Sequence, residues 1–346
     1  MKIAVILPSW VGDTVMATPA LRSVRQRYPD AHLVGLGRYA PVHLLEPLGW
    51  FDDLVNHGKT TRQRLTCAWR LRSQRFDLSI NFPASESAAL IARTLGAPHR
   101  LGFDSGLNRW LLNDLEPHPR NIPFTERRSE IERFLGLVQR LGCDTSDRRV
   151  ELRSTAAADA LAQQSLAQCG LDRFAKLVVV NSSGAVAESK LWHEPHLIEC
   201  CRQLAQRGDT GVLIHCGPGE REAARAVTQA CDHPAVQSMA DWPELPLELS
   251  ISLMRRAAVV VSTDSGPRHI AVAMNRPVIS LFGSTNVEPT RTFNHPEVVM
   301  QEPLACRPCW KKECPLGHHD CMRRLTPERV RQAVEQVFAA QDAAAA

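Results

Sequence analysis

The stretch that decides the fold is residues 257–283, AAVVVSTDSGPRHIAVAMNRPVISLFG. β-Branched runs at residues 259–261 and 278–281 enclose a small polar turn and a short apolar helix pattern. Short runs of this kind are typical of strands buried on both faces, and their alternation with helices favours a parallel sheet. The sequence therefore predicts a strand-turn-helix-strand unit of an α/β fold.

Ligands of such sheets bind at the carboxyl ends of the strands. Here that end carries Thr263, Asp264, Ser265 and Gly266, which open the next helix. The helix dipole and its free N–H groups favour an anion, and a diphosphate fits that description. The alternative is that Asp264 or Ser265 only caps the helix.

Length and composition describe a two-domain protein of ordinary soluble character, with 346 residues and 44% hydrophobic residues. The net charge of +4 gives no reason to expect nucleic acid. The first apolar run stops at Pro8, too short for a signal-peptide core, and no later run is long enough to span a bilayer. We expect a cytoplasmic protein whose cysteines are reduced thiols or metal ligands.

The N-terminal half begins with a strand at residues 2–7, the loop PSWVGD and a helix at residues 14–27. The turn lacks G-x-G-x-x-G, which argues against a nicotinamide enzyme. Asp13 follows the strand. It either caps the helix or serves as a carboxylate that takes a proton from an alcohol, and both roles are compatible.

Further strand and helix patterns continue this half as a doubly wound domain: residues 32–35, 42–46, 53–56, 62–75, 78–82, 84–95 and 126–141. Basic side chains are dense after residue 58. Lys59, Arg62 and Arg64 stand where a loop enters a helix, so they are candidates for binding carboxylate or phosphate groups of an acceptor. The alternative is a solvated helix face. The linker is expected near residues 152–156, giving domains 1–154 and 155–346.

The C-terminal half repeats the plan with strands at residues 177–180 and 211–216. The first is followed by a small-residue turn with Ser183 and Gly184, then by Lys190, Trp192 and a helix at 196–206. Lys190 suits a diphosphate as a point charge, or it is an exposed helix-flanking residue. After the second strand, Gly217 permits close backbone approach, and Glu220 or Glu222 is suited to ribose hydroxyls. A final helix begins at Thr326-Pro327-Glu328 and runs over 327–340.

A cysteine-rich insert occupies residues 305–322, with Cys306, Cys309, Cys314 and Cys321 spaced C-x2-C-x4-C-x6-C. Four thiolates at such spacing form a tetrahedral structural site, for zinc first and iron second. The alternative is a set of free thiols.

Two α/β halves with polar loops at their strand ends predict a ligand held between them. No Asp-x-Asp pair occurs, so a metal-bridged nucleotide diphosphate is not expected. Lys190 and the helix start at Ser265 and Gly266 would take up the leaving-group charge instead. With Asp13, these parts suit sugar transfer from a nucleotide diphosphate sugar to an alcohol.

On KIAVILPSWVGDTVMATPALRSVRQRYP, the Gly184-Ala185 and Lys190-Leu191-Trp192 positions, and STDSGPRHIAVAMNRPVISLFG, the chain resembles glycosyltransferase family nine, the ADP-heptose:lipopolysaccharide heptosyltransferases. PSWVGD is more similar to the second-heptose than to the first-heptose enzymes. The resemblance implies a GT-B fold, two Rossmann-like domains facing across a cleft, and inverting, metal-independent transfer from ADP-L-glycero-beta-D-manno-heptose to the inner-core heptose. It further implies cytoplasmic work at the inner face of the membrane that holds the lipopolysaccharide acceptor.

The same resemblance makes Asp13 the base and places Lys190 on the diphosphate. It puts Asp264, Ser265, Gly266 and His269 at the nucleotide-sugar site.

The chain departs from many relatives in its N-S-S-G-A turn, in Glu188-Ser189 before Lys190 and in the cysteine insert. A branch that heptosylates autotransporter proteins carries a four-cysteine metal finger, so a protein or other glycan acceptor stays open, as does a non-catalytic nucleotide-sugar or metal-binding protein.

Overall fold

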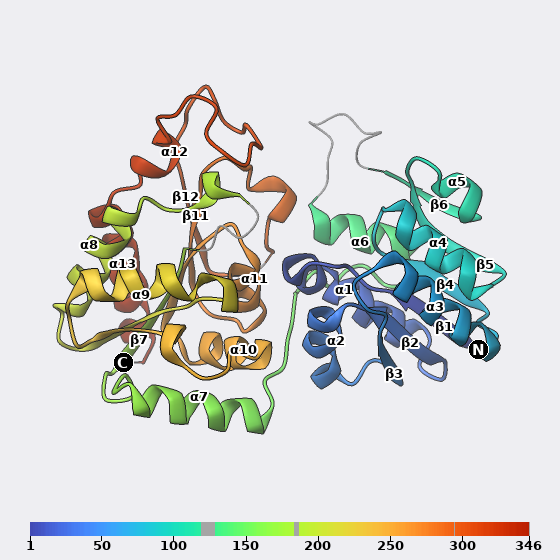
Figure 1. Cartoon of the computed structure of the whole chain (residues 1–346), viewed down its shortest axis with the longest axis horizontal. Coiled ribbons are helices and arrows are strands. Elements are labelled where there is room, and N and C mark those ends of the chain that lie inside the picture. The colour runs from blue at the N-terminus through green and yellow to red at the C-terminus, as the bar shows by residue number, and fades with distance from the viewer. Residues whose placement is uncertain (119–128, 183–186, 294, 346) are drawn as a thin grey trace. The chain divides into compact units, whose positions relative to one another are not determined.

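The computed structural model describes residues 1–118, 129–182, 187–293 and 295–345. They form two compact units (Figure 1): Met1–Leu152 with Glu288–Phe293, and Arg153–Val287 with Asn294–Ala346. Each unit holds one six-stranded sheet whose described pairings are parallel.

The first sheet has the strand order β3-β2-β1-β4-β5-β6. Its strands are β1 (Lys2–Ile6), β2 (His32–Gly37), β3 (Asp53–Asn56), β4 (Leu78–Asn81), β5 (His99–Asp104) and β6 (Asp114–Pro117). The helices of this unit are α1 (Val11–Arg27), α2 (Tyr39–Leu45), α3 (Thr61–Leu71), α4 (Glu86–Leu95), α5 (Asn108–Leu111) and α6 (Glu130–Gln139). Single turns of 3-10 helix lie at η1 (Glu46–Leu48), η2 (Arg72–Gln74) and η8 (Glu288–Thr290).

Alternate residues of the first sheet enter two different cores, as expected for a sheet covered on both faces. Ile3, Val5 and Leu7 pack with α1 and α6 on one face. Ala4 and Ile6 pack with α3 and α4 on the other. Phe293 packs against the first of these cores, which is why the short piece Glu288–Phe293 belongs to this unit.

The second sheet has the order β12-β11-β10-β7-β8-β9. Its strands are β7 (Lys176–Asn181), β8 (Thr210–Ile214), β9 (Val236–Ser238), β10 (Val259–Thr263), β11 (Val278–Phe282) and β12 (Glu297–Gln301). Its helices are α7 (Ala156–Gln168), α8 (Glu194–Ala205), α9 (Arg221–Cys231), α10 (Leu247–Arg256), α11 (Gly266–Ala273), α12 (Asp320–Arg323) and α13 (Pro327–Ala345), with 3-10 turns η5 (Glu188–Lys190), η6 (Pro218–Glu220) and η7 (Met239–Asp241).

The prediction of a doubly wound α/β fold is confirmed, and so is the unit β10-α11-β11, in which Val260 pairs with Val278. Capping boxes fix two helix starts, Thr60 with Gln63 at α3 and Ser129 with Glu132 at α6. The sequence interpretation missed α7, an alanine-rich helix with few large apolar residues to mark a face. It also placed the start of α1 at residue 14, three residues late. Within the described residues, no helix is long and apolar enough to cross a membrane.

Candidate active site

The turn after β10 in the second unit has the geometry of an anion-binding helix start. Ser265 stands at the N-cap of α11 in an extended conformation (φ −148°, ψ 172°), yet its side chain makes no cap hydrogen bond. Its Oγ instead donates to the carbonyl of Thr263, 3.2 Å away. The helix start is therefore not capped by its own serine, which leaves its amide groups suited to a ligand.

Lys190 and Asp264 form an ion pair at this turn, with Nζ 2.8 Å from Oδ2. Lys190 Nζ also donates to the main-chain carbonyl of Asp264, and the Thr285 hydroxyl donates to the same Oδ2 at 2.8 Å. The Asp264 side chain is only 7% exposed, whereas that of Lys190 is 24% exposed. Burial alone would raise the pKa of Asp264, but Lys190 beside it holds that pKa below its ordinary value. A charged lysine thus lies next to the helix start, partly open to solvent.

The turn η5 that carries Lys190 is fixed from behind through Ser189. Its N–H donates to the carbonyl of Lys312 (2.9 Å) and its hydroxyl to that of Lys311 (2.5 Å). His319 Nε2 lies 2.9 Å from the carbonyl oxygen of Ser189. Gly283 makes this approach possible, because a Cβ there would stand 2.9 Å from the same oxygen. The cysteine-rich segment therefore holds the turn that carries Lys190 in place through these hydrogen bonds.

A buried chain of polar side chains fixes Ser265. Asn181 Nδ2 donates to Ser265 Oγ at 3.0 Å, and Asn181 Oδ1 lies 3.1 Å from His215 Nδ1. His215 Nε2 is 2.9 Å from Ser250 Oγ. Since Asn181 Oδ1 can only accept, His215 carries its proton on Nδ1 and accepts from Ser250. Burial lowers the pKa of His215 to about 4, so the ring is neutral near pH 7.

His269 and Arg268 lie under the first turn of α11. Burial first, and then the neighbouring Arg268, lower the pKa of His269 to about 3. Arg268 is fully buried, and its Nε is 2.7 Å from Glu297 Oε1. These side chains hold the helix to the sheet, and the structure places His269 in the interior.

The other residues predicted at the nucleotide-sugar site have different positions. Trp192 is buried, and its indole N–H donates to the carbonyl of Leu325 at 2.8 Å, so its ring is part of the core. Glu220 Oε2 accepts from the N–H of Gly217 at 2.9 Å, and Glu222 is exposed in the first turn of α9. Ser183 and Gly184 lie outside the described residues.

Asp13 belongs to the first unit, in the first turn of α1 and half-buried. The N-cap of this helix is Trp10, which makes no side-chain cap hydrogen bond. The expected capping role therefore does not fall on Asp13, although its charge still favours the helix start. A carboxylate in this place, just beyond the carboxyl end of β1, suits a general base.

A cluster of cations follows β2 and β3 at the same end of the first sheet. Lys59 and Arg62 are exposed, while Arg64 is half-buried and donates to the carbonyl of Lys59 at 2.9 Å. Arg38 and His57 join them. Burial first, and then Arg64 and Arg38, lower the pKa of His57. Among the described residues, the Nε atoms of Arg38 and Arg64 have no hydrogen-bond partner, so the cluster suits an anion.

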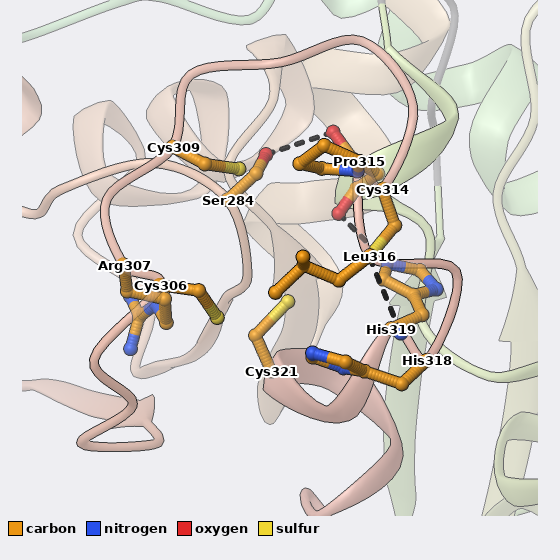
Figure 2. A pocket seen from close by; sticks show the side chains of 11 residues that line it. Ser284, Cys306, Arg307, Cys309, Cys314, Pro315, Leu316, His318, His319 and Cys321 are labelled. Carbon is orange, nitrogen blue, oxygen red and sulfur yellow. Dashed lines mark hydrogen bonds between the residues drawn. The ribbon is translucent and has the colours of Figure 1, made fainter.

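The four clustered cysteines surround one small cavity of about 20 Å³ (Figure 2). His318 and His319 complete its polar lining, and the N–H of His319 donates to Cys314 Sγ at 3.4 Å. The four cysteines, Cys306, Cys309, Cys314 and Cys321, thus lie together in the fold, as their spacing predicted. In the part of the chain that the structure describes, however, no three His, Cys, Asp or Glu are arranged to hold a metal ion.

Sequence reasoning missed several residues that shape these sites. Asn181 is the last residue of β7 and Arg38 directly follows β2, so the rule that ligands meet the carboxyl ends of strands was a usable signal for both. His215 directly follows β8 and carried the same signal. Ser189 and Thr285 gave no such signal, because their roles depend on partners 122 and 21 residues away.

Comparison with known proteins agrees with this architecture. Residues 64–319 match the family model described as Glycosyltransferase family 9 (heptosyltransferase). Lipopolysaccharide heptosyltransferase 2 of Escherichia coli K12 is 24% identical over 99% of this chain and 100% of its own length. The structure of E. coli ADP-heptose lps heptosyltransferase II superposes with a TM-score of 0.81 at 22% identity, covering 99% of this chain and 100% of that one.

A more distant structure, the iron-containing dodecameric glycosyltransferase TibC from enterotoxigenic E. coli, has a TM-score of 0.57 at 16% identity and covers 98% of this chain and 76% of its own. These neighbours establish the two Rossmann-like sheets as a GT-B fold. The family match extends over most of the chain and includes the ion pair and helix start described above, although not Asp13. The chain therefore belongs to glycosyltransferase family 9, the heptosyltransferases.

Proposed function

We propose that this glycosyltransferase moves heptose from ADP-L-glycero-beta-D-manno-heptose to the heptose of the lipopolysaccharide inner core, with inversion and without a catalytic metal. The proposal is carried by one observation: Lys190, paired with Asp264, lies at the start of α11, where the N-cap residue Ser265 makes no side-chain cap hydrogen bond. The full-length relative named lipopolysaccharide heptosyltransferase 2 supports the choice of acceptor, and the structure named ADP-heptose lps heptosyltransferase II supports the choice of donor.

The second unit would bind the donor. Diphosphate oxygens would accept from the first amides of α11 and from Lys190, whose charge is not fully desolvated. As the bond from the anomeric carbon to the diphosphate oxygen breaks, negative charge grows on ADP. Lys190 and the helix dipole stabilise that charge in the place that a metal ion takes in other nucleotide-sugar enzymes.

The first unit would bind and activate the acceptor. Asp13 would take the proton of the acceptor hydroxyl while its oxygen forms the new bond to the anomeric carbon and ADP leaves with the bonding electron pair. One displacement inverts the anomeric configuration. The cations Arg38, Lys59, Arg62 and Arg64 would bind phosphate or carboxylate groups of the inner core.

We further propose that the four cysteines hold one structural zinc or iron ion. The cavity that they surround supports this, but the thiols must move closer together to ligate, because no described trio is arranged for a metal. Four protein ligands would leave no open position for substrate, so the ion would stabilise the segment and take no part in transfer.

The test is an acceptor assay with purified protein, ADP-heptose and lipopolysaccharide truncated after its first heptose. The expected product gains one heptose in the mass spectrum, carries the inverted configuration by NMR, and forms equally well with and without added magnesium or manganese. Transfer to a protein acceptor and not to the truncated lipopolysaccharide would replace this proposal with its alternative, a protein heptosyltransferase. ADP-heptose binding without transfer to any acceptor would indicate a non-catalytic protein.

A further inference from the structure

The outer surface of three helices in the first unit carries large apolar side chains that the fold does not use. Helices α3, α4 and α5 lie side by side (Figure 1), and their inner residues pack into one core of the first sheet. On their outside, Trp69 of α3 is 68% exposed and Trp110 of α5 is 78% exposed. Leu90 of α4 and Leu107 beside α5 are exposed as well. Exposed tryptophans are costly in water, so two of them on one layer of helices indicate an interaction surface.

The stretch of chain that forms this layer of helices is rich in cations. Residues 59–111 hold nine Lys and Arg against three Asp and Glu, whereas the remaining chain has more acids than bases. The exposed cations of this surface are Lys59, Arg62, Arg70, Arg72, Arg75, Arg93 and Arg109. Of these, only Arg109 has a carboxylate partner among the described residues, Asp104 at 3.5 Å.

The helix dipoles explain only part of this charge. Arg70 and Arg93 stand in the last turns of α3 and α4, and the side chain of Arg72 lies over Gly96 at the C-terminal end of α4, where a cation is favourable. Lys59 and Arg62 lie instead at the start of α3, where the dipole disfavours a cation. A helix face that alternates arginine with tryptophan and leucine is suited to a lipid headgroup region, where guanidinium groups meet phosphates and indole rings lie at the interface.

We infer that the outer face of α3, α4 and α5, here called the α3–α5 surface, docks on an anionic phospholipid bilayer. The inference rests on the proposed function, because the acceptor of that reaction is itself a membrane lipid. The α3–α5 surface would bind in the plane of the headgroups without insertion of a helix. The positive charge supplies attraction to the anionic surface, and Trp69 and Trp110 supply the apolar contact.

The second unit offers a matched control. Trp310, Lys311 and Lys312 are consecutive, and all three side chains are exposed. This segment has an aromatic ring, two cations and the exposed Leu316, but it is a loop and not part of a layer of helices. If any exposed tryptophan with basic neighbours were enough, its removal would matter as much as changes on the α3–α5 surface.

The experiment is flotation of the full chain with vesicles of phosphatidylcholine, with or without phosphatidylglycerol, in the absence of donor and acceptor. We expect binding only with phosphatidylglycerol and its loss at high salt. Trp69→Ala with Trp110→Ala, and separately Arg70→Glu with Arg93→Glu, should each lower the partition coefficient about tenfold or more. Trp310→Ala with Lys311→Glu and Lys312→Glu should leave the partition coefficient unchanged.

A second measurement uses vesicles with brominated lipids. These lipids should quench the tryptophan fluorescence of the wild type more than that of the Trp69 and Trp110 variant, a readout that does not require the arginine variant to fold.

Failure to bind phosphatidylglycerol vesicles, or an equal loss in the Trp310 control, would overturn the inference. Self-association that is abolished by the Trp69 and Trp110 changes, without vesicle binding, would identify the α3–α5 surface as a contact between copies and reject the membrane. Transfer to a detergent-solubilised acceptor should be unchanged in both α3–α5 variants. Because flotation needs no substrate, vesicle binding without any transfer would refute the proposed function and leave the docking surface standing.

Discussion

Lys190 Nζ lies 2.8 Å from Asp264 Oδ2, and this pair joins two segments 74 residues apart at the start of α11. Asp264 is buried and is also held by Thr285, whereas Lys190 is partly exposed. The carboxylate therefore fixes the direction of the ammonium group without using all three of its donors. A diphosphate at the helix start would find a lysine already in place.

Lys190→Ala should lower turnover by about a hundredfold or more, because the lost charge stabilises the leaving group more in the transition state than in the ground state. The measurement is steady-state kinetics with ADP-heptose varied. Lys176→Ala is the matched control, since it removes a lysine of the same unit that pairs with Asp342. A change in the donor KM alone would assign Lys190 to binding only.

Asp13→Asn should lower turnover by about a hundredfold or more and leave donor affinity nearly intact, because a general base acts on the acceptor hydroxyl. Glu194→Gln is the control, since it removes another carboxylate from the first turn of a helix, α8. Calorimetry with ADP and single-turnover rates would separate binding from chemistry. Equal rates for wild type and Asp13→Asn would leave Asp13 with a purely structural role.

Arg38→Ala and Arg64→Ala, singly and together, should raise the KM of the lipopolysaccharide acceptor and leave that of ADP-heptose unchanged. The reason is that the Nε atoms of these guanidinium groups have no hydrogen-bond partner among the described residues, so both groups can bind an anion. The effect should shrink as salt increases. Arg93→Ala serves as the control with a solubilised acceptor, and a parallel rise in both KM values would point to damaged folding.

The pH dependence of stability should report the buried His215. The unfolded ring has a pKa of 6.5 and the folded one about 4. Between those values the unfolded chain binds a proton that the folded chain does not, so the free energy of unfolding rises with pH over this window. The shift corresponds to about 3 kcal/mol, fully present above pH 6.5 and lost as the pH falls through about 4.

His215→Asn should lower the slope of the free energy of unfolding against pH by the contribution of about one bound proton, because the amide does not titrate. Denaturant unfolding at about pH 5 and about pH 7.5 would measure the slope. A slope that is unchanged by the substitution would show that His215 is not the group that titrates.

The sequence predicted the fold well where local signals were strong. Residues 257–283 gave β10, α11 and β11 because apolar runs and a polar turn are local features. Helix α7 was missed because alanine and glutamine mark no face. The sequence predicted that Trp192, two residues after Lys190, contacts the nucleotide. Its side chain is instead buried in the core. Hydrogen bonds between residues far apart in the chain, such as those of Ser189 with Lys311 and Lys312, are set by tertiary packing. No local sequence pattern predicts them.

The cysteine cavity and Lys190 are linked, and this gives the metal proposal a kinetic consequence. Ser189, adjacent to Lys190, bonds to the carbonyls of Lys311 and Lys312, which lie between Cys309 and Cys314 in the chain. An ion held by the four thiols would keep these carbonyls in place and thereby keep Lys190 at the helix start.

Protein purified without chelator should therefore contain about one equivalent of zinc or iron, measured by inductively coupled plasma mass spectrometry. Cys309→Ser with Cys314→Ser should remove the metal, lower the melting temperature and reduce turnover. Cys67→Ser with Cys169→Ser is the control, because these half-buried thiols lie outside the cluster.

Ser189→Ala should lower turnover through the position of Lys190 while the metal stays bound. This variant separates the effect of the Ser189 hydrogen bonds from the effect of the ion. Metal-free wild-type protein with four reactive thiols, and a melting temperature that a chelator does not change, would show that the segment supports Lys190 by hydrogen bonds alone.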